Sequence, residues 1–133
     1  MSGIGIKELA FVGYAVHDIA AARRFYGRIL GLNEGMVFEH EGEAAWVEFE
    51  IPGGQTLAIT RASDQWQPSR HGGGACLEVA DLDAAVASIE NAGGVIAMSI
   101  QDFPVCRLAL VADPSGNTIA LHQKKPNHPE LPS

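Results

Sequence analysis

The hydrophobic and polar positions of the chain follow the same order twice. An apolar run over residues 9–16, typical of a strand, leads to Asp18, and apolar residues at helical spacing continue from there as far as Gly31. Residues 74–79, Asp81 and a second helical stretch repeat this order in the other half of the chain. Each half therefore predicts a strand that leads through a capping aspartate into a helix.

Three short segments rich in β-branched and aromatic residues follow each predicted helix. They lie at 35–40, 44–51 and 55–61 in the first half, and at 95–100, 106–112 and 117–123 in the second. Turn-forming residues separate the last two segments of each half, at 52–54 (PGG) and at 113–117 (DPSGN). The sequence therefore predicts an α+β fold of two βαβββ modules in tandem, packed into one body with a groove between them.

The pattern divides the chain into four parts. Residues 1–61 form the first predicted module and residues 74–125 the second. Residues 62–73, which end in a run of glycines, link the two modules. The proline-rich residues 126–133 form a tail that cannot continue a sheet.

Composition and charge narrow the class of protein. With 133 residues, 47% of them hydrophobic and 19% charged, the chain can bury a real core. A net charge of −7 argues against a nucleic-acid partner, which would require clustered lysines and arginines. The chain shows no signal-peptide pattern and no apolar stretch long enough to span a membrane, so we expect a cytoplasmic protein without a membrane partner.

Three local motifs accompany the paired modules. The step from strand to helix reads V-x-D in both halves, Phe25 and Tyr26 precede a Leu-Gly pair at 30–31, and DPSGN closes the last hairpin. Together these features resemble the vicinal oxygen chelate superfamily of glyoxalase I, bleomycin-resistance proteins and extradiol dioxygenases, from about residue 8 to residue 123. The resemblance implies that each module curls a mixed sheet with one main helix, that paired modules enclose a cleft, and that the chain forms a homodimer.

The same resemblance implies where a metal ion would bind. In the metalloenzymes of this superfamily, a histidine or similar ligand on the first strand and a glutamate on the last strand of each module hold one divalent ion. The corresponding positions here are Phe11, Ala58, Gly74 and Ala120, none of which has a metal-donor side chain. We therefore expect no metal cofactor, and a cleft suited to a small and largely apolar molecule.

Cysteines and histidines give no other metal-binding pattern. Cys76 and Cys106 lie in apolar runs without a CxxC motif, so we expect buried, reduced thiols. Of the five histidines only His122 suggests chemistry, because strand alternation places it on the same face as Ala120, near the mouth of the cleft. It is a candidate general base or ligand contact, and the alternative is a half-exposed histidine at a strand end.

Aromatic and acidic residues suggest what the cleft could bind. Alternation places Trp46, Glu48 and Glu50 on one face of the segment 44–51. This face is either a solvated acidic edge or a wall that binds a cationic aromatic molecule, as in the bleomycin-resistance proteins that the chain resembles. Trp66 in the linker is a second candidate for ligand stacking, and ordinary packing is the alternative for both tryptophans.

The leading hypothesis is a protein that binds a small aromatic or cationic molecule without a metal ion. Its expected ligand-binding residues are Phe11, Trp46, Glu48, Ala58, Gly74, Ala120 and His122. One alternative is a glyoxalase-type lyase, isomerase or dioxygenase that uses a relocated metal or metal-free acid–base chemistry. The other is a structural or regulatory dimer whose own side chains fill the groove.

Overall fold

The computed structural model describes residues 3–126 of the chain. The first module contains β1 (Val12–Val16), α1 (Ile19–Arg23), η1 (Arg24–Ile29), β2 (Asn33–His40), β3 (Glu43–Ile51) and β4 (Gln55–Arg61). The second contains β5 (Cys76–Glu78), α2 (Leu82–Asn91), β6 (Val95–Asp102), β7 (Cys106–Ala112) and β8 (Thr118–Lys124). The predicted tail lies outside the described residues, apart from its first residue.

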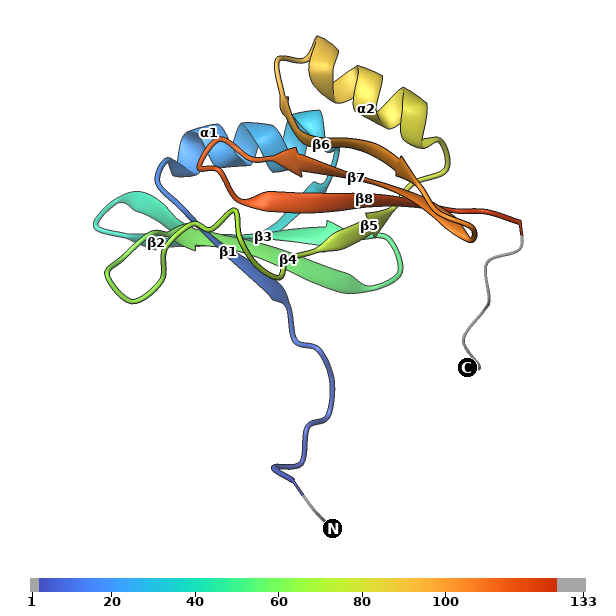
Figure 1. Cartoon of the computed structure of the whole chain (residues 1–133). Helices are drawn as coiled ribbons and strands as arrows, with labels where there is room; N and C mark the ends of the chain where they lie inside the picture. Colours follow the sequence, from blue (N-terminus) through green and yellow to red (C-terminus); the bar gives the residue numbers. More distant parts are fainter. Residues whose placement is uncertain (1–2, 127–133) are drawn as a thin grey trace.

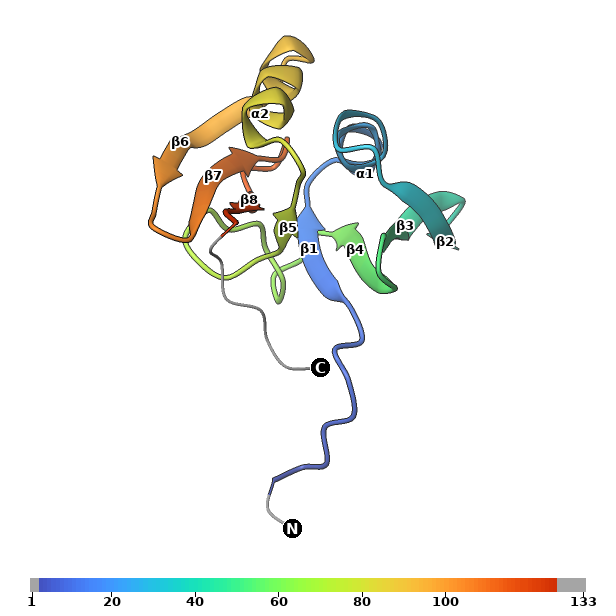
Figure 2. The same ribbon diagram turned by 90° about the vertical axis from the view of Figure 1, so that its right-hand side faces the viewer.

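Each module forms a mixed four-stranded sheet. The strand order is β1-β4-β3-β2 in the first sheet and β5-β8-β7-β6 in the second. In both, the first strand pairs parallel with the last, and the other neighbours pair antiparallel. The helices lie on the same side of the sheets, and β1 and β5 are the inner strands (Figures 1 and 2). The predicted α+β fold of two tandem modules is confirmed.

The first helix departs from the regular helix that its periodicity predicts. Asp18 caps it as expected, since its Oδ1 accepts a hydrogen bond of 3.0 Å from the backbone N–H of Ala21. After a short α-helical part, residues 24–29 form a π-helix in which Leu30 N–H donates to the carbonyl of Phe25 at 2.9 Å. The wider turn lets the consecutive residues Phe25 and Tyr26 both enter the core.

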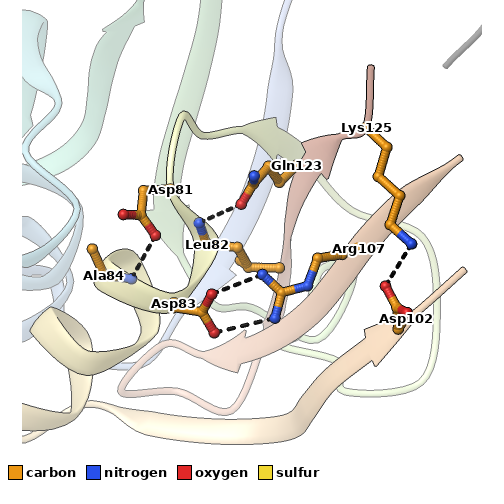
Figure 3. Close-up of polar contacts among 8 residues, drawn as sticks. All are labelled: Asp81, Leu82, Asp83, Ala84, Asp102, Arg107, Gln123 and Lys125. Carbon is orange, nitrogen blue, oxygen red and sulfur yellow. Dashed lines mark hydrogen bonds and ion pairs between the residues drawn. The ribbon is translucent and has the colours of Figure 1, made fainter. Parts of the chain in front are cut away.

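Side chains from the second sheet hold the start of α2 in place (Figure 3). Asp81 caps the helix through the N–H of Ala84, and the Gln123 side chain on β8 accepts the N–H of Leu82 at 2.8 Å. Arg107 on β7 makes a two-pronged ion pair with Asp83, at 2.8 and 3.1 Å. The backbone N–H groups of Leu82 and Ala84 are therefore bonded by one strand side chain and by the capping aspartate. In residues 3–126 no helix has both the length and the apolar character needed to cross a membrane.

One hydrophobic core runs through both modules. Strand alternation turns one face of each sheet toward the helices, and the buried side chains there include Val16, Tyr26, Val47, Phe49, Leu57 and Ile59 from the first module, and Leu82, Ile89, Val111, Ile119 and Leu121 from the second. The two modules thus share a single buried interior, as expected for units too small to bury their own sheets.

The DPSGN turn joins the two modules through a buried carboxylate. Each carboxylate oxygen of Asp113 accepts two hydrogen bonds. Oδ1 accepts the backbone N–H groups of Ser115 and Asn117, at 2.8 and 2.9 Å. Oδ2 accepts the Tyr26 hydroxyl at 2.8 Å and the side-chain amide N–H of Asn117 at 2.9 Å. Asn117 also donates to the carbonyl of Ala15 on β1 at 2.7 Å. Burial of the Tyr26 hydroxyl raises its pKa, and the negative charge of Asp113 raises it further. The hydroxyl therefore stays protonated and donates.

The Tyr14 hydroxyl forms a second link between the modules. It accepts the N–H of Ala75 at 2.6 Å and lies 3.1 Å from the carbonyl of Thr118, to which it donates. A Cβ atom at Gly74 would collide with this hydroxyl. Glycine at position 74 is therefore required by the close approach of Tyr14.

The prediction of buried cysteines is wrong for Cys76, which is exposed, and Cys106 is only partly buried. Both thiols are free. The short strand β5 directs Leu77 toward the core, so its neighbours Cys76 and Glu78 point the other way. Desolvation by neighbouring groups, followed by the charge of Glu78, raises the pKa of the Cys76 thiol.

Asp113→Ala is expected to lower the free energy of unfolding by about 3 kcal/mol or more, because it leaves three buried donors and one partly buried donor without their acceptor. Tyr26→Phe removes one of these bonds and should cost about 1.5–3 kcal/mol. Urea denaturation of the purified protein measures both changes.

The matched control is Asp64→Ala, at an exposed linker position, where a change within about 0.5 kcal/mol is expected. Equal stabilities of the Asp113 and Asp64 variants would contradict the role given to the buried carboxylate.

Candidate functional site

The predicted site residues of the first module lie on the face of its sheet that points away from the helices. Ala58 on β4 lies between Gly13 on β1 and Glu48 on β3, to which it is paired in register. Trp46 lies one row further along, opposite Thr60. Because alternate residues of a strand share a face, Trp46, Glu48 and Ala58 lie on the same side of the sheet.

Aromatic side chains cover this side of the sheet. The rings of Phe11 and Trp46 meet edge to face, with their centroids 5.1 Å apart. The Trp66 ring lies against Gly13, so close that a Cβ atom there would be 2.8 Å from the ring carbons Cζ2 and Cη2. Phe38 on β2 is paired in register with Trp46. We call these four residues, Phe11, Phe38, Trp46 and Trp66, the aromatic face.

The aromatic face is partly open to solvent and has one carboxylate beside it. Phe11, Phe38 and Trp66 are 39%, 49% and 41% exposed. The indole N–H of Trp46 donates to Oε2 of Glu48 at 2.9 Å, which fixes both side chains. The arrangement offers flat apolar surface together with a negative charge, which suits contact with an aromatic or cationic molecule.

Sequence reasoning found Phe11, Trp46 and Trp66 but missed Phe38. The signal for Phe38 was present, since it lies in the strand-like segment before that of Trp46. However, the pairing of β2 with β3 shifts register on both sides of the Val37–Phe38 pair. Alternation alone therefore could not show that Phe38 lies opposite Trp46.

The predicted residues of the second module lie on the corresponding side of the other sheet. Ala120 on β8 is paired with Cys76, and His122 with Glu78. Gly74 precedes β5 and packs against Tyr14, as described above. In the first module, Ala15 occupies the position equivalent to Glu78 and Thr60 the position equivalent to His122. Ala15 and Thr60 are paired in register in the same way.

His122 and Glu78 form a close side-chain pair. Nδ1 of His122 lies 2.5 Å from Oε1 of Glu78, and Oε2 of Glu78 accepts the backbone N–H of Lys124 at 2.8 Å. A carboxylate accepts hydrogen bonds, so the ring carries a proton on Nδ1. Desolvation alone would raise the pKa of Glu78, but its bonds with His122 and Lys124 outweigh this effect and lower it. Sequence reasoning missed Glu78, because only the parallel pairing of β5 with β8 reveals it.

The structure gathers the predicted residues into two groups, one on each sheet. Four of the cavities on the surface of residues 3–126 have volumes of about 230 to 580 Å³, and no predicted site residue lines any of these four. Within residues 3–126, no three His, Cys, Asp or Glu side chains gather as they would around a metal ion. The side chains of Phe11, Ala58, Gly74 and Ala120 do not fit a divalent ion, because they carry no donor atoms.

Comparison with known proteins places this geometry in a family. No curated protein is similar enough in sequence to count as a match. Among solved structures, the chain is similar to TnmS3, an antibiotic binding protein from Streptomyces sp. CB03234, with 22% identity and a TM-score of 0.76 over 92% of this chain and 100% of that one. TioX from Micromonospora sp. ML1 gives 22% identity and a TM-score of 0.70 over 90% of this chain and 100% of that one.

A third similar structure comes from Sphaerobacter thermophilus DSM 20745 and is described as a member of the glyoxalase/bleomycin resistance protein/dioxygenase superfamily. It shares 23% identity and a TM-score of 0.74 over 90% of this chain and 98% of that one. At these identities the likeness concerns the fold. The sequence itself matches a family model over residues 8–121. The chain belongs to the Glyoxalase/Bleomycin resistance protein/Dioxygenase superfamily.

Proposed function

We propose that this protein binds a small aromatic or cationic molecule, without a metal ion, against the aromatic face. The observation that carries the proposal is the set of exposed rings around Gly13 and Trp46, with Glu48 beside them. Exposed aromatic rings beside a carboxylate attract flat cations through stacking, cation–π contact and charge. TnmS3, which shares the fold, is described as an antibiotic binding protein, and this supports a binding role.

The proposal includes a homodimer that completes the cleft. In the single chain, large apolar side chains remain exposed on the edge strand β2, where every residue is exposed, and before β1, at Ile4, Ile6 and Leu9. Exposed apolar surface of this kind is typical of an interface. A two-fold partner could place the second sheet of one copy opposite the aromatic face of the other, which would enclose the ligand.

Acid–base catalysis at His122 is the second candidate function. The specific observation in its favour is the hydrogen bond between His122 and Glu78, since a histidine oriented by a carboxylate is a common arrangement for proton transfer. In this case the aromatic face would hold the substrate and His122 would move the proton, with no ion involved.

Three quinolines that share one ring system but differ in charge test the ligand class. We expect N-methylquinolinium to bind more tightly than quinoline, and quinoline-2-carboxylate to bind least, as measured by calorimetry. Trp66→Ala should weaken the binding of all three compounds by about 1–3 kcal/mol, because their stacking on the Trp66 ring is lost. Glu48→Gln should remove the preference for the cation.

Glu90→Gln, at an exposed position on α2, is the control for charge and should leave the preference intact. Equal affinity for the three probes, or no binding by any member of a broad aromatic library, would argue against the proposal. One tightly held divalent ion per chain, found by elemental analysis, would overturn its metal-free part.

Mixing two variants with weakened binding tests whether two chains share the cleft. If Trp66→Ala and His122→Ala each weaken the binding of N-methylquinolinium, their heterodimer should contain one cleft with both substitutions and one cleft with neither. Random exchange should then restore binding to about a quarter of all clefts. A cleft within one chain would recover nothing. Light scattering provides the second readout, because the expected mass is twice the 14.1 kDa of the chain.

The pair of Glu78 with His122 predicts a pH-dependent contribution to stability. A carboxylate whose pKa is lowered by folding stabilises the protein above its unfolded pKa, near 4.5, and this contribution disappears as the pH falls through the lower folded value. Glu78→Gln should therefore destabilise the protein more at pH 7 than at pH 3. The loss should stay below about 1 kcal/mol, because Glu78 is 45% exposed and solvent screens the pair.

Urea denaturation at the two pH values measures the difference, with Glu90→Gln as the control that should match the wild type at both. A deficit of the Glu78 variant that is the same at pH 3 and pH 7 would show that the carboxylate charge has no part in the effect.

A further inference from the structure

A polar hollow lies at the junction of the two modules, apart from the aromatic face. Its volume is about 320 Å³. It is lined by His17 after β1, by residues 68–71 of the linker, and by Ser115 and Gly116 of the turn between β7 and β8. We call it the linker hollow. All three segments that meet there are loops, and each comes from a different part of the chain.

The linker hollow is basic in a protein whose net charge is −7. Its lining contains Arg70 and two histidines but no Asp or Glu. Arg70 makes no ion pair with any residue of the described range 3–126, and the same holds for Arg24 and Arg28. The carboxylate of Asp113, in the adjacent turn, is buried and its oxygens are occupied by four donors.

Two serine hydroxyls in the hollow are able to donate. The Ser115 oxygen accepts the backbone N–H of His17 at 2.8 Å, and the Ser69 oxygen accepts that of His71 at 3.2 Å. A hydroxyl that already accepts a hydrogen bond still has its own proton to donate. The hollow therefore presents hydroxyl, guanidinium and imidazole donors, and its side chains offer no anionic acceptor.

Buried contacts hold this donor set in place. The backbone N–H of Ser69 donates to the side chain of Asn117 at 2.8 Å, and Asn117 is almost completely buried. Nη2 of Arg70 lies over the turn, 3.5 Å from where a Cβ atom of Gly116 would be. The linker backbone is thus fixed to the same turn that joins the modules, and this places the exposed Arg70 beside the two serines.

We propose that the linker hollow binds a small oxyanion, a phosphate group above all. A tetrahedral oxyanion has several acceptor oxygens, which match a guanidinium fork and two hydroxyl donors from different directions. The site is separate from the aromatic face, and the proposed function does not depend on it.

Titration of the isotope-labelled protein with inorganic phosphate, followed by NMR, tests the proposal. The backbone amide signals of residues 69–71, 115 and 116 should shift and reach saturation, with a dissociation constant on the order of millimolar. Arg70→Gln should weaken binding by about tenfold, because a charge-assisted hydrogen bond is lost. Arg28→Gln, which removes an exposed arginine on η1 outside the hollow, should leave the affinity unchanged.

Sodium chloride at matched ionic strength separates binding from screening and should not reproduce the shifts. A comparison of phenyl phosphate with phenol shows whether the hollow accepts a phosphate group carried by an organic molecule. Phenyl phosphate should bind there and phenol should not. Shifts that increase linearly without saturation, or equal affinity in the wild type and Arg70→Gln, would overturn the proposal.

Discussion

The buried carboxylate of Asp113 fixes how the two modules of this protein meet. A charge taken out of water costs several kcal/mol unless donors surround it, and here four donors do so. They come from the π-helical part of the first module, through Tyr26, and from the DPSGN turn of the second. Three of the four bonds lie within the turn itself, and the fourth, from Tyr26, forms only when the two modules are correctly placed. The carboxylate thereby selects one arrangement of two sheets that hydrophobic packing alone would hold less specifically.

This arrangement decides which surfaces remain available for function. The shared core occupies the helix-facing sides of both sheets, so only the opposite sides are left for the proposed binding of a ligand. On the first sheet, Gly13 leaves room for the Trp66 ring, and the result is an aromatic face. On the second, parallel pairing of β5 with β8 brings Glu78 to His122. One repeat thus supports two different surfaces, because Ala15 and Thr60 occupy in the first module the places that Glu78 and His122 occupy in the second.

The sequence was sufficient for features that depend on local chemistry. The repeat, the capping aspartates Asp18 and Asp81, and the DPSGN turn are all written in short stretches of sequence, and the structure confirms them. It was insufficient where distant residues decide the outcome. Apolar spacing could not distinguish a π-helix from an α-helix at Phe25 and Tyr26, since both place apolar side chains on one side. Nor could it show that Asp113 meets Tyr26, because that contact spans the two modules.

Packing around the Tyr14 link and the first sheet limits which side chains could act as metal donors at positions 74 and 58. The Tyr14 hydroxyl fills the space beside Gly74 while it bonds to Ala75 and Thr118, so any side chain at position 74 would have to displace it. Ala58 is completely buried, so a longer side chain there would have to push aside its neighbours. At these two positions the packing that joins the modules and covers the first sheet competes with metal coordination for the same space. The proposed recognition of a ligand through rings and a carboxylate makes no demand on this space.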